Sequence, residues 1–365
     1  MINLKGVRNT YLYASLLVLA LTLISCFEEI KVPPSYDPPG AGKDVKGVYI
    51  SGTAMSDNGT AVASYWRNGV PVNLTATYLD AIVYNSAGFG MAISGTDIYV
   101  CGVLITSKGN IPTYWKNGTP VTLTPDNGEA TAIAVVGNNV YVSGFVSFAN
   151  GDHYGVVWKN GVISYLSEGA NFSMANALVV SGQNVYVGGY LVQDGKTYAT
   201  YWKNGNPVLL SSGENFGHVR SLAIAGNTVY AAGRELGTYV GKYWKDGQEV
   251  NLSDGSSQVI VSAIYTKGHD VYVAGKRQNG DSWELLVWKN DEIITTTPMN
   301  GFDIQIHNIL VSHDNVIVTG GVIFRNENSS VYTHATVWTN GVSMTLPNGA
   351  DETNAYLANS IVIRN

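Results

Sequence analysis

Six histidines, two cysteines and 27 acidic side chains are the groups of this 365-residue chain that could bind a metal or catalyse a reaction. The histidines lack metal-ligand spacing, and Cys26 and Cys101 alone cannot form a thiolate cluster. Glycoside hydrolysis needs two carboxylates flanking the scissile bond, and among Glu214, Asp254 and Asp303 nothing singles out a pair. The sequence therefore predicts no catalytic residue, no metal site and no cofactor.

A second set of candidates occupies one equivalent position, directly before each of seven predicted inner strands: Phe89, Thr131, Asn176, Arg220, Ser262, His307 and Asn359. Most of these side chains are polar, whereas the residue two positions later is always apolar, as at Ile133 and Leu222. If the seven residues surround the mouth of a central channel, a polar ring above an apolar layer can hold a small polar ligand. The alternative is a water-filled mouth without a specific ligand.

These positions are equivalent because the chain repeats one unit, whose fullest marker is Tyr201-Trp202-Lys203-Asn204-Gly205. Its tryptophan recurs at successive spacings of 49, 43, 44, 42, 44 and 50 residues, at Trp66, Trp115, Trp158, Trp202, Trp244, Trp288 and Trp338. Seven copies at one period indicate seven copies of a single structural unit.

Each unit contains four short apolar runs, a to d, separated by turn residues. In the unit around Trp158 the runs are 131–136, 140–144, 154–159 and 162–166. β-Branched and aromatic runs bounded by Gly and Asn indicate strands, and no stretch has helical periodicity. The Asn-Gly pair after Trp-Lys predicts a type I′ turn between c and d, because Asn and Gly tolerate positive φ. A looser turn is expected where Asn290-Asp291 replaces this pair.

The prolines predict the order of the strands. Pro71, Pro120 and Pro207 fall early in strand d, and proline cannot donate to a ladder, so strand d lies at the outer edge and strand a lies innermost. Seven four-stranded antiparallel units predict an all-β fold, a seven-bladed β-propeller over residues 46–365. Residues 48–50 lack a strand a and residues 359–363 form a strand a alone. The C-terminal strand is therefore expected to join the N-terminal three strands and close the ring.

The spacing Ala-x-x-Ile-x-x-x-Gly-x-x-Val-x-x-Gly, followed by Trp-x-x-Gly and Leu, resembles the extracellular repeats called HAF. It is similar in layout to kelch and WD40 propellers. The resemblance covers residues 46–365, but Ala199-Thr200-Tyr201 replaces the His-Ala-Phe of HAF, and the kelch double glycine occurs only at Gly188-Gly189 and Gly320-Gly321. None of these families transfers a catalytic residue to this chain.

The N-terminus predicts export and a lipid anchor. Lys5 and Arg8 precede an apolar run of about 15 residues, too short to span a membrane, so residues 1–25 are predicted to be a signal peptide. Leu23-Ile24-Ser25-Cys26 resembles the lipobox of bacterial lipoproteins, which implies lipidation of Cys26. The alternative is an ordinary signal peptide with an incidental cysteine. The proline-rich residues 26–45 would tether the domain to the outer membrane of a Gram-negative bacterium. Glu28 and Glu29 resemble the acidic tract of some Gram-negative lipoproteins, which implies exposure at the cell surface.

Charge and loop pattern limit the partners. The formal charge of −6 argues against nucleic acid, which requires basic stripes. The b–c and d–a loops differ between units and share one face, so they are the expected binding surface, with Phe172, Phe216 and Trp283 as candidates for stacking on sugars. The leading hypothesis is a monomeric propeller that binds a glycan, a peptide or a protein partner. The alternatives are a carbohydrate-active enzyme that uses loop carboxylates and a purely structural role.

Overall fold

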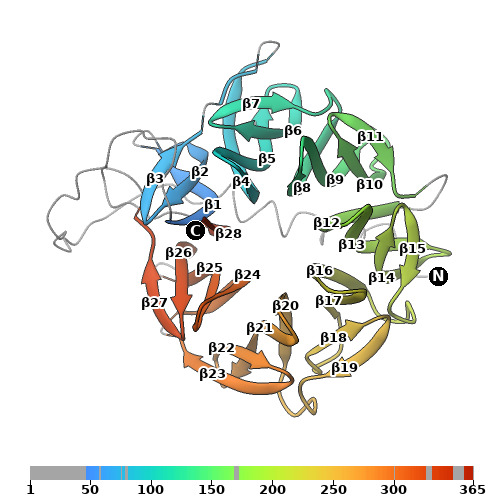
Figure 1. Cartoon of the computed structure of the whole chain (residues 1–365), viewed down its shortest axis with the longest axis vertical. Coiled ribbons are helices and arrows are strands. Elements are labelled where there is room, and N and C mark those ends of the chain that lie inside the picture. The colour runs from blue at the N-terminus through green and yellow to red at the C-terminus, as the bar shows by residue number, and fades with distance from the viewer. Residues whose placement is uncertain are drawn as a thin grey trace, which may run out of the picture.

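The computed structural model describes residues 47–56, 59–74, 76–78, 81–167, 172–299, 301–325, 331–347 and 357–364. These residues form 28 strands in seven four-stranded sheets, which are arranged in a ring around a central channel (Figure 1). Neighbouring strands within each sheet are antiparallel. The prediction of an all-β, seven-bladed propeller is confirmed. Cys26 and the proposed tether lie outside the described residues, among which no helix is long and apolar enough to cross a membrane.

We number the blades 1 to 7 along the chain and give their strands from the channel outward. Blades 1 to 3 contain β28 (Leu357–Arg364), β1 (Gly47–Met55), β2 (Ala61–Arg67), β3 (Val70–Asn73); β4 (Val83–Ser94), β5 (Asp97–Thr106), β6 (Gly109–Lys116), β7 (Thr119–Thr122); and β8 (Asn127–Val136), β9 (Asn139–Ser147), β10 (His153–Lys159), β11 (Val162–Tyr165). Blades 4 and 5 contain β12 (Phe172–Ser181), β13 (Asn184–Gln193), β14 (Lys196–Lys203), β15 (Asn206–Leu209); and β16 (Gly217–Ala225), β17 (Thr228–Glu235), β18 (Lys242–Lys245), β19 (Gln248–Asn251). Blades 6 and 7 contain β20 (Val259–Lys267), β21 (Asp270–Asn279), β22 (Ser282–Lys289), β23 (Glu292–Pro298); and β24 (Asp303–Ser312), β25 (Asn315–Arg325), β26 (Val331–Thr339), β27 (Val342–Thr345).

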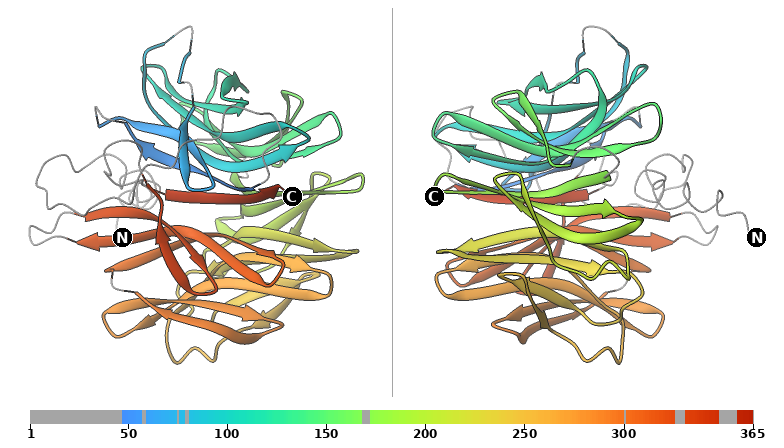
Figure 2. Two further views of the ribbon diagram at one scale, coloured as in Figure 1. Left: turned by 60° about the vertical axis from the view of Figure 1, so that its left-hand side comes forward. Right: turned by 90° about the vertical axis from the view of Figure 1, so that its right-hand side faces the viewer.

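The two ends of the described chain share blade 1, as predicted. Strand β28 pairs with β1 from Gly47↔Arg364 to Thr53↔Leu357, and the side view shows it beside the first strands of the chain (Figure 2). This pairing closes the ring and leaves no unpaired inner strand at the junction. The outer position of strand d is also confirmed, since Pro71, Pro120 and Pro207 all lie on the outermost strands β3, β7 and β15.

The c–d hairpin has the same geometry in all seven blades. Its first residue has a φ near +50°, and its Asn or Asp side chain accepts a hydrogen bond of 2.8–2.9 Å from the amide at the start of strand b. The turn residue therefore also fixes the hairpin to its neighbouring strand. The prediction of a looser turn at Asn290-Asp291 is wrong. These residues have φ values of 48° and 69°, so both are positive, as in the other c–d turns. The irregularity instead appears as a register shift between Val287 and Trp288.

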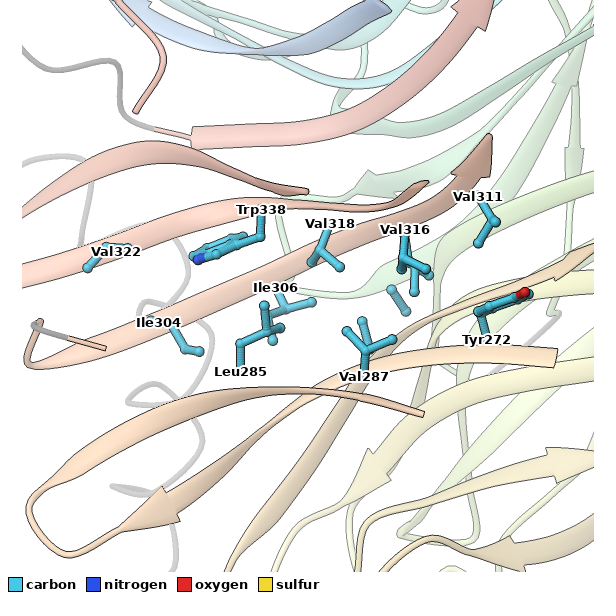
Figure 3. Close-up of a cluster of buried hydrophobic side chains, with 13 residues drawn as sticks. Tyr272, Leu285, Val287, Ile304, Ile306, Val311, Val316, Val318, Val322 and Trp338 are labelled. Carbon is cyan, nitrogen blue, oxygen red and sulfur yellow. The ribbon is translucent and has the colours of Figure 1, made fainter. Parts of the chain in front are cut away.

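The repeated tryptophans form the core between blades. Each is at most 1 % exposed, and Trp338 packs with Ile304, Val318 and, across the blade interface, Leu285 (Figure 3). In five blades the lysine after the tryptophan lies over a tyrosine ring of strand b, at 5.4–5.9 Å from its centroid. Trp, Lys and Asn of the marker thus each have a contact that stabilises the blade, and Gly adopts the positive φ of the turn, which agrees with the repetition of the marker.

The inner strands begin earlier than the sequence predicts. Strand β8, for example, starts at Asn127 rather than at Thr131, and its pairing with β9 contains a register shift between Ala130 and Ala132. A β-bulge at this equivalent position occurs in all seven inner strands. Directly after the bulge the inner strands are crowded: a Cβ added to Gly90 would lie 2.9 Å from the Cα of Ala132. This crowding explains the small residues at this position.

Candidate functional site

The seven candidate ring residues lie at the bulges. Phe89, Thr131, Asn176, Arg220, Ser262, His307 and Asn359 each occupy the register shift of an inner strand. Their predicted place directly before the strand, at the channel mouth, is wrong, because two to six residues of strand precede each of them. The ring therefore surrounds the channel inside the propeller, where the bulge turns an extra side chain away from the regular pleat.

Four of these side chains form hydrogen bonds with the next blade. Thr131 Oγ1 donates to the carbonyl of Ala175 at 2.8 Å, and Asn176 Nδ2 donates to the carbonyl of Val219 at 3.0 Å. His307 Nδ1 pairs with Asn359 Oδ1, and Asn359 Nδ2 donates to the carbonyl of Gly88 at 2.7 Å. These bonds bridge neighbouring blades at the bulges, so much of the polarity of the ring holds the blades together.

The other three residues differ from one another. Ser262 is buried, and the backbone carbonyl of Phe89 accepts a hydrogen bond of 2.7 Å from Ser51 Oγ. Arg220 is exposed although it lies on the innermost strand β16. It is nevertheless largely surrounded by protein, which lowers its pKa to about 10, and the charge of Arg234 adds to this effect. Burial, with a smaller contribution from Arg220, lowers the pKa of His307 to about 4.

Arg220 belongs to a cluster that we call the cationic cluster, formed by His218, Arg220, Arg234 and Lys276. His218 and Arg234 are directly opposite on β16 and β17, and Arg220 Nε donates to His218 Nε2 at 3.1 Å. The charges of Arg220 and Arg234 also act on Lys276 of β21. Arg220 and Arg234 are thus brought together by the pairing of β16 with β17. The signal that could have revealed the cluster is a charged residue directly after the glycine of strand b, at Arg234 and Lys276.

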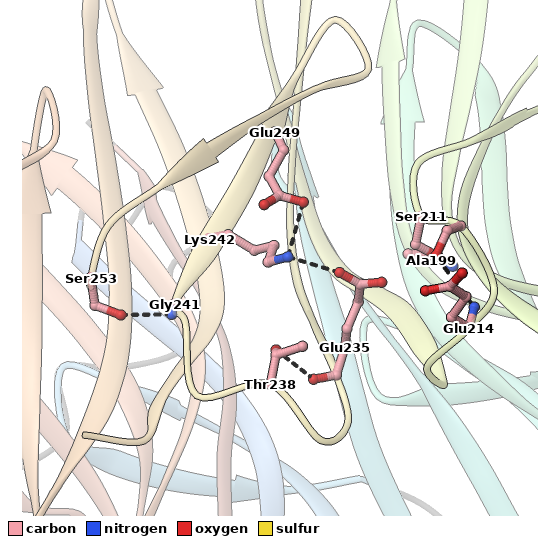
Figure 4. A network of polar contacts seen from close by, with 10 residues as sticks. Ala199, Ser211, Glu214, Glu235, Thr238, Gly241, Lys242, Glu249 and Ser253 are labelled. Atoms are coloured by element: carbon pink, nitrogen blue, oxygen red, sulfur yellow. Dashed lines mark hydrogen bonds and ion pairs between the residues drawn. The ribbon is translucent and has the colours of Figure 1, made fainter. Parts of the chain in front are cut away.

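Blades 5 and 6 also contain ion pairs in which at least one side chain is nearly buried. Lys242 Nζ binds Glu235 Oε2 at 2.8 Å and Glu249 Oε2 at 2.9 Å, with Lys242 and Glu235 nearly buried (Figure 4). In blade 6, Arg277 Nη2 binds Glu284 Oε1 at 2.5 Å. The position of Lys242 is taken by Thr200 in blade 4 and by Leu286 in blade 6. Among the described residues, ion pairs with a nearly buried member are therefore concentrated in blades 5 and 6.

The predicted stacking aromatics are mostly engaged with other side chains. Phe172 lies 6.3 Å from the ring of Tyr154, and Trp283 is covered by Lys276 Nζ at 4.2 Å from its centroid. Phe216 is 41 % exposed and lies 5.8 Å from the His218 ring, centroid to centroid. Of the three candidates, Phe216 is the one that combines exposure with a position beside the cationic cluster.

Two of the loop carboxylates considered for catalysis have separate local partners: Asp303 binds Lys276, and Asp254 Oδ1 accepts a hydrogen bond from the Ser256 amide at 2.9 Å. At Glu214 the backbone amide donates to Ser212 Oγ. A carboxylate that the sequence analysis missed is Glu129, two residues before the bulge of β8. Burial raises its pKa to about 7, and a hydrogen bond from Asn110 opposes this shift.

Within the described ranges, no three His, Cys, Asp or Glu side chains lie close enough together to bind a metal ion. Cys101 is fully buried in β5, and burial raises the pKa of its thiol to about 12. A thiol that stays protonated is a poor nucleophile and a poor metal ligand.

Comparison with known proteins identifies the fold alone. No protein-family model matches the chain, and no curated protein matches it. Among solved structures it is similar to the β-propeller domain of the Trilobed protease from Pyrococcus furiosus, with 9 % identity, a TM-score of 0.50, and coverage of 84 % of this chain and 97 % of that one. That propeller is described as having an open velcro topology, whereas β28 closes this ring.

Two peptidases also match. They are the acylaminoacyl peptidase of Pyrococcus horikoshii (11 % identity, TM-score 0.44, 83 % of this chain and 51 % of that one) and a puromycin-hydrolysing peptidase of Mycobacterium tuberculosis (13 %, 0.46, 84 % and 55 %). The match spans about half the length of each of these peptidases. The chain is a seven-bladed β-propeller, and it is similar in fold to a solved propeller domain with which it shares 9 % sequence identity.

Proposed function

We propose that the propeller is a binding module that recognises a glycan, peptide or protein partner on the face formed by the b–c and d–a loops. The observation that carries this proposal is the unequal distribution of charge among seven blades of equal architecture. The c–d end repeats the same contacts in every blade, whereas cationic groups collect in blades 5 and 6 beside the channel. Variable side chains on a rigid scaffold are the usual place for recognition.

We further propose that the protein is exported and held at the outer membrane through lipid on Cys26, with residues 26–45 as the tether. The lipobox-like residues Leu23-Ile24-Ser25-Cys26 support this location. Metabolic labelling with a palmitate analogue tests it: the wild-type protein should take up label and Cys26→Ser should not. Equal labelling of both proteins would rule out the anchor at Cys26.

A glycan array probed with full-length protein in detergent, together with a pull-down from intact cells, tests the binding function. A specific ligand should be captured by the wild-type protein and lost when Arg220 is replaced by Gln together with Phe216→Ala. The matched control is Lys203→Thr on the c–d end, which should retain binding. Silence in both assays, or equal capture by all variants, would reject the proposed binding face.

A second candidate, a carbohydrate-active enzyme, is favoured by one observation. The raised pKa of Glu129 resembles that of a general acid kept protonated near neutral pH. Such chemistry needs a second carboxylate nearby, and the carboxylates of Asp254 and Asp303 are bound by other groups. Turnover of a polysaccharide that disappears in Glu129→Gln would favour this candidate over a binding module.

A further inference from the structure

The cationic cluster contains hydrogen-bond donors that have no acceptor among the described residues. An arginine Nε always carries a proton, so the 3.1 Å contact with Arg220 Nε makes His218 Nε2 the acceptor. His218 is 8 % exposed, and burial together with the charges of Arg220 and Arg234 holds its pKa well below the usual range, so the ring is neutral. Its single proton is therefore on Nδ1, which is buried and unpartnered within the described ranges.

Arg234 has a second donor of this kind. Its Nε is buried without a partner among the described residues, although it lies directly across from His218. Burying a donor of a charged group without an acceptor is unfavourable, because the group loses its bonds to water and gains none. Two such donors beside the partly solvated guanidinium of Arg220 indicate a site that lacks its negatively charged partner.

The next blade interface contains the partner that is missing here. Lys276 follows Gly275 in β21 as Arg234 follows Gly233 in β17, so the two cations are equivalent. Lys276 Nζ binds the Asp303 carboxylate and donates to the carbonyl of Ile304 at 2.9 Å. Asp303 lies four residues before the bulge at His307, and the residue four before the bulge at Ser262 is Gln258. At the interface of blades 5 and 6 an amide therefore takes the place of the carboxylate.

A small cavity is present at this place. It has a volume of about 20 Å³, room for about one water molecule, and its lining includes Arg234, Gln258 and Ile260. Glu235 also lines the cavity, but its carboxylate binds Lys242 at 2.8 Å. Only one oxygen of a ligand can enter such a space. The cavity is also lined by Leu236, Thr238 and Val240 of the b–c loop of blade 5, so the rest of the group would lie toward this loop.

We propose that His218, Arg220 and Arg234 form a binding site for an oxyanion, a carboxylate, phosphate or sulfate group of a ligand, at the interface of blades 5 and 6. The oxyanion takes the role that Asp303 has toward Lys276. The inference rests on the proposed binding function and specifies its ligand as anionic. Exposed Phe216 beside His218 offers an apolar surface to the part of the ligand that carries the anion.

Isothermal titration calorimetry of the full-length protein in detergent tests the site, with glucuronate and inorganic phosphate as probes and glucose as the neutral control. At least one oxyanion should bind and glucose should not. Stronger binding of glucuronate indicates a sugar acid, and equal binding indicates recognition of the oxyanion alone, so both results support the site. Absence of binding by either oxyanion up to about 10 mM would overturn it.

Variants locate the binding. Arg220→Gln and Arg234→Gln should each weaken oxyanion binding about tenfold or more, because each removes a charge-assisted hydrogen bond. The matched control is Arg325→Gln, which removes an exposed cation stacked on Phe302 in blade 7 and should change binding less than about twofold. Equal losses in all three variants would mean that the protein attracts anions only through its general charge, and would reject the site.

Gln258→Asp provides a test that does not depend on removing a cation. It places a carboxylate where Asp303 lies in the next interface, so it should weaken oxyanion binding about tenfold while raising the melting temperature. Unfolding cannot produce this combination. Unchanged binding in Gln258→Asp would contradict the site. A neutral ligand on the glycan array that still binds Arg220→Gln would contradict the anion site while leaving the proposed binding function intact.

Discussion

The hairpin end of each blade and the bulge of each inner strand both occur seven times. The side chains of the hairpin end are nearly the same in every blade, whereas the side chain at the bulge differs from blade to blade. At the hairpin end the same side chains make the same contacts, such as Asn204 Oδ1 with the Val185 amide and Asn340 Oδ1 with the Val316 amide. At the bulge the backbone geometry is constant while the side chain changes from Thr131 to Arg220 to His307. The hairpin therefore specifies the blade, and the bulge provides a position where the blades can differ.

The same contrast operates between the two neighbouring interfaces that carry a cation. Between blades 6 and 7, Lys276 is neutralised by Asp303 within the protein. Between blades 5 and 6, Arg234 and Gln258 line the same cavity, and the buried Nε of Arg234 has no acceptor among the described residues. An interface that satisfies its own charges contributes to the fold, whereas one that leaves donors unsatisfied is suited to a ligand.

The largest expected effect comes from the hairpin end. Trp202→Ala removes a side chain with no exposed surface from the interface of blades 3 and 4, and large-to-small changes of this kind cost about 3–5 kcal/mol. Chemical denaturation followed by circular dichroism measures the loss. Phe216→Ala, on the loop face and 41 % exposed, is the control and should cost less than about 1 kcal/mol. Similar losses in both variants would remove the distinction between the two ends.

A pH effect should come from the bulge of blade 7. The folded pKa of His307 is about 4, below its unfolded value of about 6.5, so the unfolded chain binds a proton that the folded chain does not. Stability should therefore fall as the pH decreases from about 6.5 to about 4, by about 2–3 kcal/mol for this group. Urea denaturation across this range measures the slope. His307→Asn should have a shallower slope, and an unchanged slope would show that His307 does not contribute.

The architecture was predictable because each of its determinants is local in sequence. Positive φ at an Asn-Gly turn, the absent amide of Pro207 and the unpaired strand a predicted at residues 359–363 each restrict the topology without reference to distant contacts. The Asn290-Asp291 turn was misjudged because Asp also tolerates positive φ when the repeat holds the turn in place. Its neighbouring strand absorbs the difference through a register shift.

The candidate site was only half predictable, because the bulge is not visible in the sequence. In the hairpin of β16 and β17, Ala225 pairs with Thr228. If the two strands paired from there without a bulge, Arg234 would lie opposite Val219, on the apolar face of the blade. The bulge at Arg220 shifts the register by one residue and brings Arg234 opposite His218 instead. A one-residue shift decides which side chains share a face, so the sequence could not reveal that Arg234 and His218 lie together.

The hairpin end offers a smaller and more specific test. Asn204 has a positive φ of 51° and accepts a 2.8 Å hydrogen bond from the Val185 amide. Asn204→Ala loses the hydrogen bond and strains the backbone, and should cost about 1–2 kcal/mol. Asn204→Gly loses the bond but tolerates the φ, so it should cost about 1 kcal/mol. Equal melting temperatures of the wild-type and Gly variants would show that the side-chain bond does not contribute.

The smallest expected effect concerns Lys203, whose Nζ lies 5.6 Å from the centroid of the Tyr186 ring. Blade 7 keeps the same hairpin with Thr339 opposite Ile317, so the cation–aromatic contact is not required for the turn. Lys203→Thr copies this natural alternative and should cost less than about 1 kcal/mol, because exposed contacts of this type are weak. Lys203→Arg, which keeps the cation, should restore the melting temperature. A loss as large as that of Trp202→Ala would mean that the lysine, and not only the tryptophan and the turn, specifies the blade.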